Sequence, residues 1–103
     1  MPIPLLPPRH MIVVRLMTKI YIYCLFDGDD LFRGVYSSLK AVHRDALKIA
    51  NSGGFAVHME TGDGILAPSL TDLRNVFKGK CDVVVRYRSG RSVAKVIKTK
   101  LKE

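Results

Sequence analysis

The chain has 103 residues, of which 48% are apolar and 25% are charged, as in an ordinary folded protein. This length suits one domain and is too short for a two-domain enzyme with a cleft between lobes. Seventeen Lys and Arg residues against nine Asp and Glu residues give a net charge of +8 and a sequence pI of about 9.8. The apolar content excludes global disorder, and the net positive charge favours a polyanionic partner.

The surplus positive charge is concentrated in the last quarter of the chain. Residues 1–77 carry eight basic and seven acidic side chains, whereas residues 78–103 carry nine basic and two acidic ones. A field of one sign over a small area attracts nucleic acid, an anionic membrane surface or an acidic protein. A basic face that serves only solubility is the alternative, but solubility does not require such clustering.

The segment before Thr18 lacks the pattern of a packed element. It is rich in proline, has no basic stretch typical of a secretory signal, and contains plausible alternative starts at Met11 and Met17. We expect residues 1–16 to be a flexible extension or alternative-start segment and residues 17–103 to form a single compact domain. No run reaches the roughly eighteen apolar residues of a membrane span, so we expect no membrane partner.

The first half of the domain predicts a hairpin followed by a helix. Residues 19–26 and 31–36 are dense in β-branched and aromatic side chains, and they flank an Asp-Gly-Asp-Asp turn at 27–30. Apolar residues then recur at helical spacing over 39–50, with Ser37 and Ser38 as candidate N-caps.

The second half predicts a strand, a short helix and a final hairpin. Residues 55–60 read as a strand, and a short apolar run follows at 65–66. A short helix is expected over 70–77, and strands are expected over 81–88 and 92–102. The order ββ-α-β-α-ββ predicts an α+β fold, a two-layer domain with a mainly antiparallel sheet and two helices.

Both cysteines, Cys24 and Cys81, stand inside apolar runs that are typical of strands. Two cysteines are too few for a disulfide framework, and their spacing is not that of a zinc site. We therefore expect both thiols to be reduced and buried in a cytoplasmic protein.

An acidic turn is the first candidate for chemistry. Asp27, Asp29 and Asp30 between two strands are comparable to the carboxylate hairpin that holds magnesium in template-directed RNA polymerases. The further acidic ligands that this chemistry needs are missing, and Asp63 would contribute only if the two turns met in space. Turn geometry alone accounts for Asp and Gly at these positions.

Histidines and glycines give no catalytic signature either. His10, His43 and His58 have no sequence context that links them to a nucleophile. Gly53-Gly54 follows a helix, whereas a phosphate-binding loop precedes one. We expect no catalytic residues, no metal site and no cofactor.

Basic residues form two candidate surfaces. Lys40, Arg44 and Lys48 are four residues apart and form one row on a helix, although a solvated helix face would look the same. The C-terminal hairpin is the stronger candidate, because Arg86 and Arg88 share one side of a strand that neighbours further cations.

In that hairpin, Arg91 marks the turn, and Lys98, Lys100 and Lys102 share one side of the last strand. Paired strands would bring these cations within reach of successive phosphates, a mode that binds the backbone without reading bases. Tyr87 is expected in the core, with base stacking as its alternative role. The candidate nucleic-acid-binding residues are Lys40, Arg44, Lys48, Lys78, Lys80, Arg86, Arg88, Arg91, Lys95, Lys98, Lys100 and Lys102.

Three runs carry a resemblance: Tyr-Cys-Leu-Phe-Asp at 23–27, Gly-Val-Tyr-Ser-Ser at 34–38 and Ala-Val-His-Arg-Asp-Ala-Leu at 41–47. Over residues 18–103 the chain resembles small accessory proteins of T-even-type bacteriophages, in which a hairpin leads into a serine-capped helix. With its basic C-terminal hairpin, it is most similar to phage inhibitors of the toxin ribonucleases of toxin–antitoxin systems. The resemblance implies a non-enzymatic, RNA-binding antitoxin in the host cytoplasm, acting as a homo-oligomer or an RNA-bridged assembly with the toxin.

The sequence is compatible with three functions. The leading hypothesis is an RNA-binding inhibitor of a host defence factor. The second is a direct protein–protein inhibitor that docks its basic hairpin on an acidic host protein without nucleic acid. The third is a small metal-dependent nuclease that uses Asp27, Asp29 and Asp30.

Overall fold

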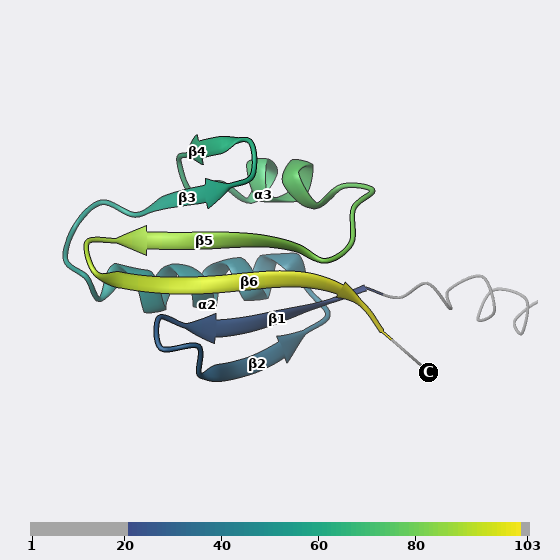
Figure 1. Ribbon diagram of the computed structural model, residues 1–103, viewed down its shortest axis with the longest axis horizontal. Helices are drawn as coiled ribbons and strands as arrows, with labels where there is room; N and C mark the ends of the chain where they lie inside the picture. Colours follow the sequence, from purple (N-terminus) through teal and green to yellow (C-terminus); the bar gives the residue numbers. More distant parts are fainter. Residues whose placement is uncertain (1–20, 102–103) are drawn as a thin grey trace, which may run out of the picture.

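The computed structural model describes residues 21–101, in which one six-stranded antiparallel sheet is covered on one side by two helices (Figure 1). The expected segment 1–16 lies outside the described residues. The elements are β1 (Tyr21–Asp27), β2 (Phe32–Tyr36), α2 (Leu39–Asn51), β3 (His58–Thr61), β4 (Gly64–Leu66), α3 (Leu70–Phe77), β5 (Val83–Ser89) and β6 (Ser92–Lys100). The α+β class and the two-layer arrangement are confirmed.

The strands lie in the order β2-β1-β6-β5-β3-β4. The first and last strands, β1 and β6, pair at the centre of the sheet, from Tyr21 opposite Lys100 to Asp27 opposite Ala94. This pairing joins the N-terminal hairpin to the C-terminal one, so that both hairpin turns and the end of α2 meet at one end of the sheet (Figure 1).

Serine caps begin both helices, and the sequence predicts the one that precedes α2. The Ser38 hydroxyl oxygen accepts a hydrogen bond from the Ala41 amide, and the Ser69 hydroxyl oxygen accepts one from the Asp72 amide. Each bond satisfies an amide that has no partner within its helix, which is why each helix begins where it does.

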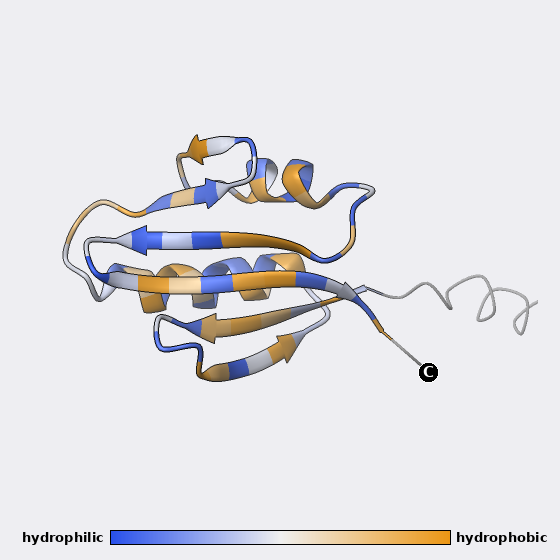
Figure 2. Cartoon of the chain, in the orientation of Figure 1, coloured by the Kyte–Doolittle hydropathy of each residue, from blue (hydrophilic) through white to orange (hydrophobic). Residues whose placement is uncertain are grey.

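The core lies between the sheet and the helices and follows the strand period of two. Val85 and Tyr87 of β5 and Val96 of β6 point toward the helices and are fully buried. They pack against Val42 and the other buried residues of α2, which recur at helical spacing along that helix. The burial of Tyr87 confirms its core assignment. In Figure 2, orange and blue bands alternate along β6, whereas the first half of β5 is continuously orange.

Two sequence-based expectations are corrected. The apolar run at 65–66 belongs to β4, which pairs with β3, so the observed order is ββαββαββ. Cys81 is exposed and Cys24 is only half-buried, so the expectation of two buried thiols is wrong. The sequence places Cys81 at the start of a strand, but β5 begins only at Val83, so Cys81 lies in the connection before it. Within residues 21–101, no helix is long and apolar enough to cross a membrane.

Candidate nucleic-acid interface

The sheet face turned away from the helices, here called the open face, carries a row of side chains in register across neighbouring strands. Arg86 lies opposite Lys95, Lys95 opposite Phe26, and Phe26 opposite Phe32. We call these four residues the cationic–aromatic row. Adjacent strands are about 4.8 Å apart, so the row runs straight across β5, β6, β1 and β2.

Cations from the C-terminal hairpin line a hollow of about 430 Å³ on the open face, at the end of the sheet where the β1–β2 and β5–β6 turns lie. Its basic lining consists of Arg86, Arg88, Arg91 and Lys95. The sequence predicted all four as nucleic-acid-binding residues, and the structure brings them together.

Carboxylates neutralise only part of this cluster. Arg88 Nε lies 2.7 Å from Glu60 Oε2, and Lys95 Nζ lies 2.7 Å from Asp30 Oδ1. The Arg88 guanidinium is the main reason why the pKa of Glu60 is lowered. Within residues 21–101, Arg86 and Arg91 form no ion pair. These two guanidinium groups are the ones available to phosphate.

Two aromatic rings extend the cluster. Lys95 Nζ lies 5.2 Å from the centroid of the Phe26 ring, a cation–π distance. The rings of Phe26 and Phe32 meet edge to face with centroids 5.7 Å apart. Phe32 is 58% exposed. Neither Phe26 nor Phe32 is among the functional candidates that the sequence predicts. The alternation of side chains along β1 predicts which face of the sheet Phe26 occupies. It does not predict that β1 pairs with β6, a strand distant in sequence, and this pairing places Phe26 next to the cations.

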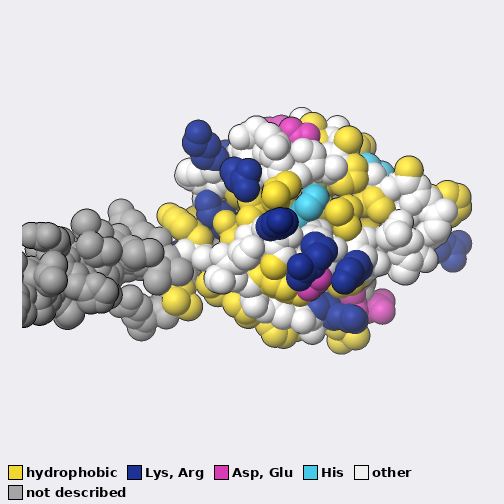
Figure 3. Space-filling view, turned by 180° about the vertical axis from the view of Figure 1, so that it is seen from behind, with side chains coloured by type: hydrophobic (Ala, Val, Ile, Leu, Met, Phe, Trp, Pro, Cys, Tyr) yellow, Lys and Arg dark blue, Asp and Glu magenta, His cyan; other side chains and the backbone are white. Residues whose placement is uncertain are grey.

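The basic row of α2 lies on the other side of the molecule. Lys40, Arg44 and Lys48 are exposed on the outer surface of the helix, as the four-residue spacing predicts. Figure 3 looks onto this side and shows Lys and Arg side chains spread across it, with a histidine between them. The sheet separates this row from the open face, so the two surfaces do not form one flat site.

The last strand does not present its lysines as expected. Lys98 is only 7% exposed, and its Nζ donates a hydrogen bond of 2.6 Å to the Phe77 carbonyl oxygen. Lys98 lies opposite Val83, which also faces the helices. The prediction that Lys98 joins Arg86 and Arg88 on a solvent face is therefore wrong. Lys98 is three positions after Lys95, which lies on the open face, and an odd spacing along a strand reverses the face.

The remaining basic candidates lie away from the open-face cluster or outside the described chain. Lys100 ends β6 on the Lys98 side and is exposed. Lys78 and Lys80 are exposed after α3. Lys102 lies outside the described residues.

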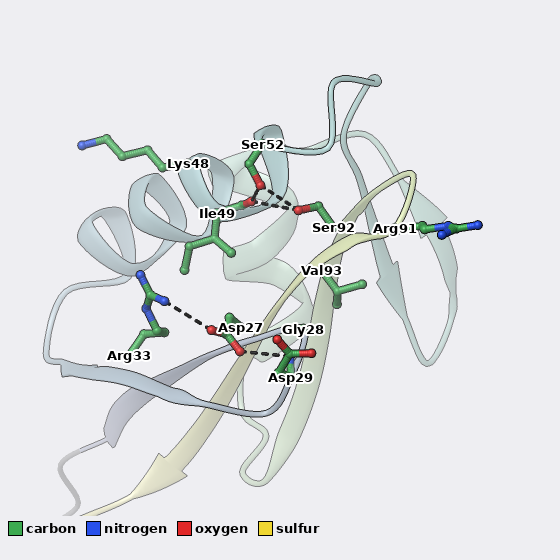
Figure 4. Close-up of a pocket in the computed structure, with 10 residues that line it drawn as sticks. All are labelled: Asp27, Gly28, Asp29, Arg33, Lys48, Ile49, Ser52, Arg91, Ser92 and Val93. Atoms are coloured by element: carbon green, nitrogen blue, oxygen red, sulfur yellow. Dashed lines mark hydrogen bonds and ion pairs between the residues drawn. The ribbon is translucent and has the colours of Figure 1, made fainter.

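The acidic turn serves structure. Asp27 Oδ1 accepts hydrogen bonds from the Asp29 and Leu31 amides, and Asp27 Oδ2 binds Arg33 at 3.2 Å. These bonds close the β1–β2 turn beside a cavity of about 580 Å³, from which the Lys48 and Arg91 side chains point away (Figure 4). Within residues 21–101, no three metal-ligating side chains of the His, Cys, Asp or Glu type gather to hold a metal ion.

Two of the three histidines are engaged in structural pairs. His43 Nδ1 lies 2.6 Å from the Tyr87 hydroxyl, and His58 Nε2 lies 3.1 Å from Glu60 Oε2. His10 lies outside the described residues.

Comparison of the chain with family models, with curated proteins and with solved structures finds no match.

Proposed function

We propose that the protein binds single-stranded RNA on the open face of its sheet. The observation that carries this proposal is the cationic–aromatic row, with Arg86 free of carboxylate partners among the described residues and Phe32 exposed at the other end. Arg86 and Arg91 would bind phosphates, and the Phe26 and Phe32 rings would stack with bases.

A single strand fits this surface better than a duplex. Bases inside an RNA helix are stacked on one another, whereas unpaired bases can be splayed out and stacked on aromatic side chains of a sheet. The distance from Arg86 to Phe32 across the row is three strand spacings, or about 14 Å. Phosphate and stacking contacts tolerate any base, so little sequence preference is expected.

We further propose a biological role from the resemblance to phage inhibitors of toxin ribonucleases. In this role the protein is a non-enzymatic accessory protein of a bacteriophage that inhibits a host defence ribonuclease in the host cytoplasm. It would act through bound RNA as a homo-oligomer or an RNA-bridged assembly. The support is the sequence of the β1–β2–α2 segment, residues 23–47.

The test is RNA binding by a variant with Arg86→Gln and Arg91→Gln, measured by fluorescence anisotropy with two unrelated single-stranded RNAs. We expect affinity to fall at least about tenfold and nearly equally for both RNAs, since charged hydrogen bonds to phosphate contribute about 1.5–3 kcal/mol each. The matched control is Lys40→Gln with Lys48→Gln on α2, which removes the same charge from the opposite side.

Retention of full RNA affinity by the folded open-face variant would refute this proposal. The direct protein–protein inhibitor would then lead, because the same face also exposes the apolar side chains of Phe32 and Val35. Co-purification with an acidic host protein that persists after ribonuclease treatment would support that alternative.

A further inference from the structure

A second cavity, of about 350 Å³, lies on the helix side of the sheet between α3, β1 and β6. It shares no lining residue with the open-face hollow. Three cations line it, namely Arg74, Lys78 and Lys98, and none of its lining residues is acidic.

Lys98 is the unusual member of this set. Its side chain is over nine-tenths buried, its Nζ donates to the Phe77 carbonyl oxygen, and its Nζ lies 4.4 Å from the centroid of the Tyr21 ring. Among the described residues, no carboxylate pairs with it. An ammonium has three N–H donors, and a buried charge is costly unless it is paired. An anion in the adjoining cavity would supply the missing charge.

Arg74 and Lys78 add positive charge at the rim. Arg74 lies in the last turn of α3 and Lys78 is the residue that directly follows the helix, and both are exposed. Neither forms an ion pair within residues 21–101. Three cations that converge on one small cavity favour a ligand with more than one negative charge, such as a phosphate monoester.

The rest of the wall is apolar and aromatic. The Tyr23 and Phe77 rings are 5.7 Å apart and line the cavity together with Leu39. The volume lies within the range of small-molecule sites, about 300–1,000 Å³. A cavity lined by both cations and aromatic rings matches a phosphate attached to a nucleoside.

We propose that this cavity binds the phosphate monoester of a nucleotide, with Lys98, Arg74 and Lys78 around the phosphate and Tyr23 beside the nucleoside. The ligand is either a free nucleoside monophosphate or the phosphorylated 5′ end of an RNA. The site does not depend on RNA binding at the open face.

The first experiment measures binding of uridine 5′-monophosphate to the full chain by calorimetry, with uridine as the ligand control. We expect the monophosphate to bind and uridine to bind at least about tenfold more weakly, because two or more charged contacts are lost. Arg74→Gln with Lys78→Gln should weaken monophosphate binding by a similar factor. Lys80→Gln is the matched control, since Lys80 is exposed nearby but does not line the cavity.

The second experiment separates the two sources of phosphate. In the Arg86→Gln, Arg91→Gln background, a short RNA with a 5′ phosphate is compared with the same RNA ending in a 5′ hydroxyl. Preference for the phosphorylated end, lost with Arg74→Gln and Lys78→Gln, identifies an RNA end as a ligand. Monophosphate binding without that preference identifies a free nucleotide. The proposal is overturned if neither phosphate binds, or if the Arg74 and Lys78 substitutions leave binding unchanged.

Discussion

At the residue scale, His43 and Tyr87 form a pair that links α2 to the sheet. Burial lowers the pKa of His43 and raises the pKa of Tyr87. The tyrosine therefore keeps its proton, and since Tyr87 has no other hydrogen-bond partner among the described residues, its hydroxyl donates to Nδ1 of a neutral imidazole. Protonation of His43 would remove that acceptor and place a charge in a partly buried site.

This pair predicts a loss of stability in mild acid. Unfolded His43 takes up its proton near pH 6.5, whereas folded His43 does so only at a lower pH. The unfolded state therefore binds more protons in that interval, and the free energy of unfolding falls as pH drops below about 6.5. Urea unfolding between pH 7.5 and 5 measures this. The variant His43→Gln should have a lower free energy of unfolding than the parent protein at pH 7.5 but lose less of it on acidification. An equal loss in the variant and in the parent would contradict the assignment of this pH dependence to His43.

The two cysteines give a second prediction at this scale. Cys81 is exposed and Cys24 is half-buried in β1, so a thiol reagent should modify Cys81 first under native conditions. Mass spectrometry of a labelling time course, with Cys81→Ser as the control, measures both rates. Equal rates for the two thiols would show that β1 opens as readily as the loop that carries Cys81.

At the scale of elements, the end of α2 is tied to the β5–β6 turn. The Ser89 hydroxyl accepts from the Phe55 amide at 2.9 Å and donates to the Phe55 carbonyl oxygen at 2.6 Å. The Ser52 and Ser92 hydroxyls lie 2.7 Å apart. This connection brings Gly53 so close to the β5–β6 turn that a Cβ there would collide with the Ser89 carbonyl oxygen.

The substitution Gly53→Ala should therefore destabilise the protein by about 1–3 kcal/mol, since the backbone of one of the two segments must move. Gly62→Ala is the matched control, because its Cβ would meet nothing within 4 Å. Chemical denaturation of both variants tests the expectation. An unchanged stability in Gly53→Ala would mean that the α2–β5–β6 connection adjusts without cost.

Local patterns predicted most of these elements, and non-local pairing accounts for what they missed. The first hairpin and both helices follow from turn residues, serine caps and apolar spacing within a few residues. β4 has only three residues, so its own sequence does not identify it without its partner β3. The alternation along β6 predicts that Lys98, Lys100 and Lys102 share one face, but it does not predict which face of the sheet this is. The pairing of Lys98 with Val83, which faces the helices, places Lys98 on the helix side.

At the scale of the whole molecule, positive charge lies on both layers of the described chain, and on the open face it shares one row with the aromatic rings of Phe26 and Phe32. In the proposed binding of RNA, the contributions of charge and of stacking would depend differently on salt concentration. Each phosphate contact releases counterions, so its loss flattens the dependence of affinity on salt. Stacking of a base on a ring releases none, so its loss weakens binding equally at every salt concentration.

Titrations at several salt concentrations should therefore distinguish the two ends of the cationic–aromatic row. Arg86→Gln with Arg91→Gln removes two contacts, and the slope of log affinity against log salt should fall in magnitude by about 1.4, since each phosphate contact of a single strand contributes about 0.7. Phe32→Ala should leave the slope unchanged while weakening binding by about 1–3 kcal/mol throughout. Phe32 is largely exposed, so its removal should change stability little. If Phe32→Ala left affinity intact while the arginine variant lost it, the RNA would follow the hairpin cations without crossing to β1 and β2. If Phe32→Ala flattened the slope, the ring would support phosphate contacts and the stacking role would be refuted.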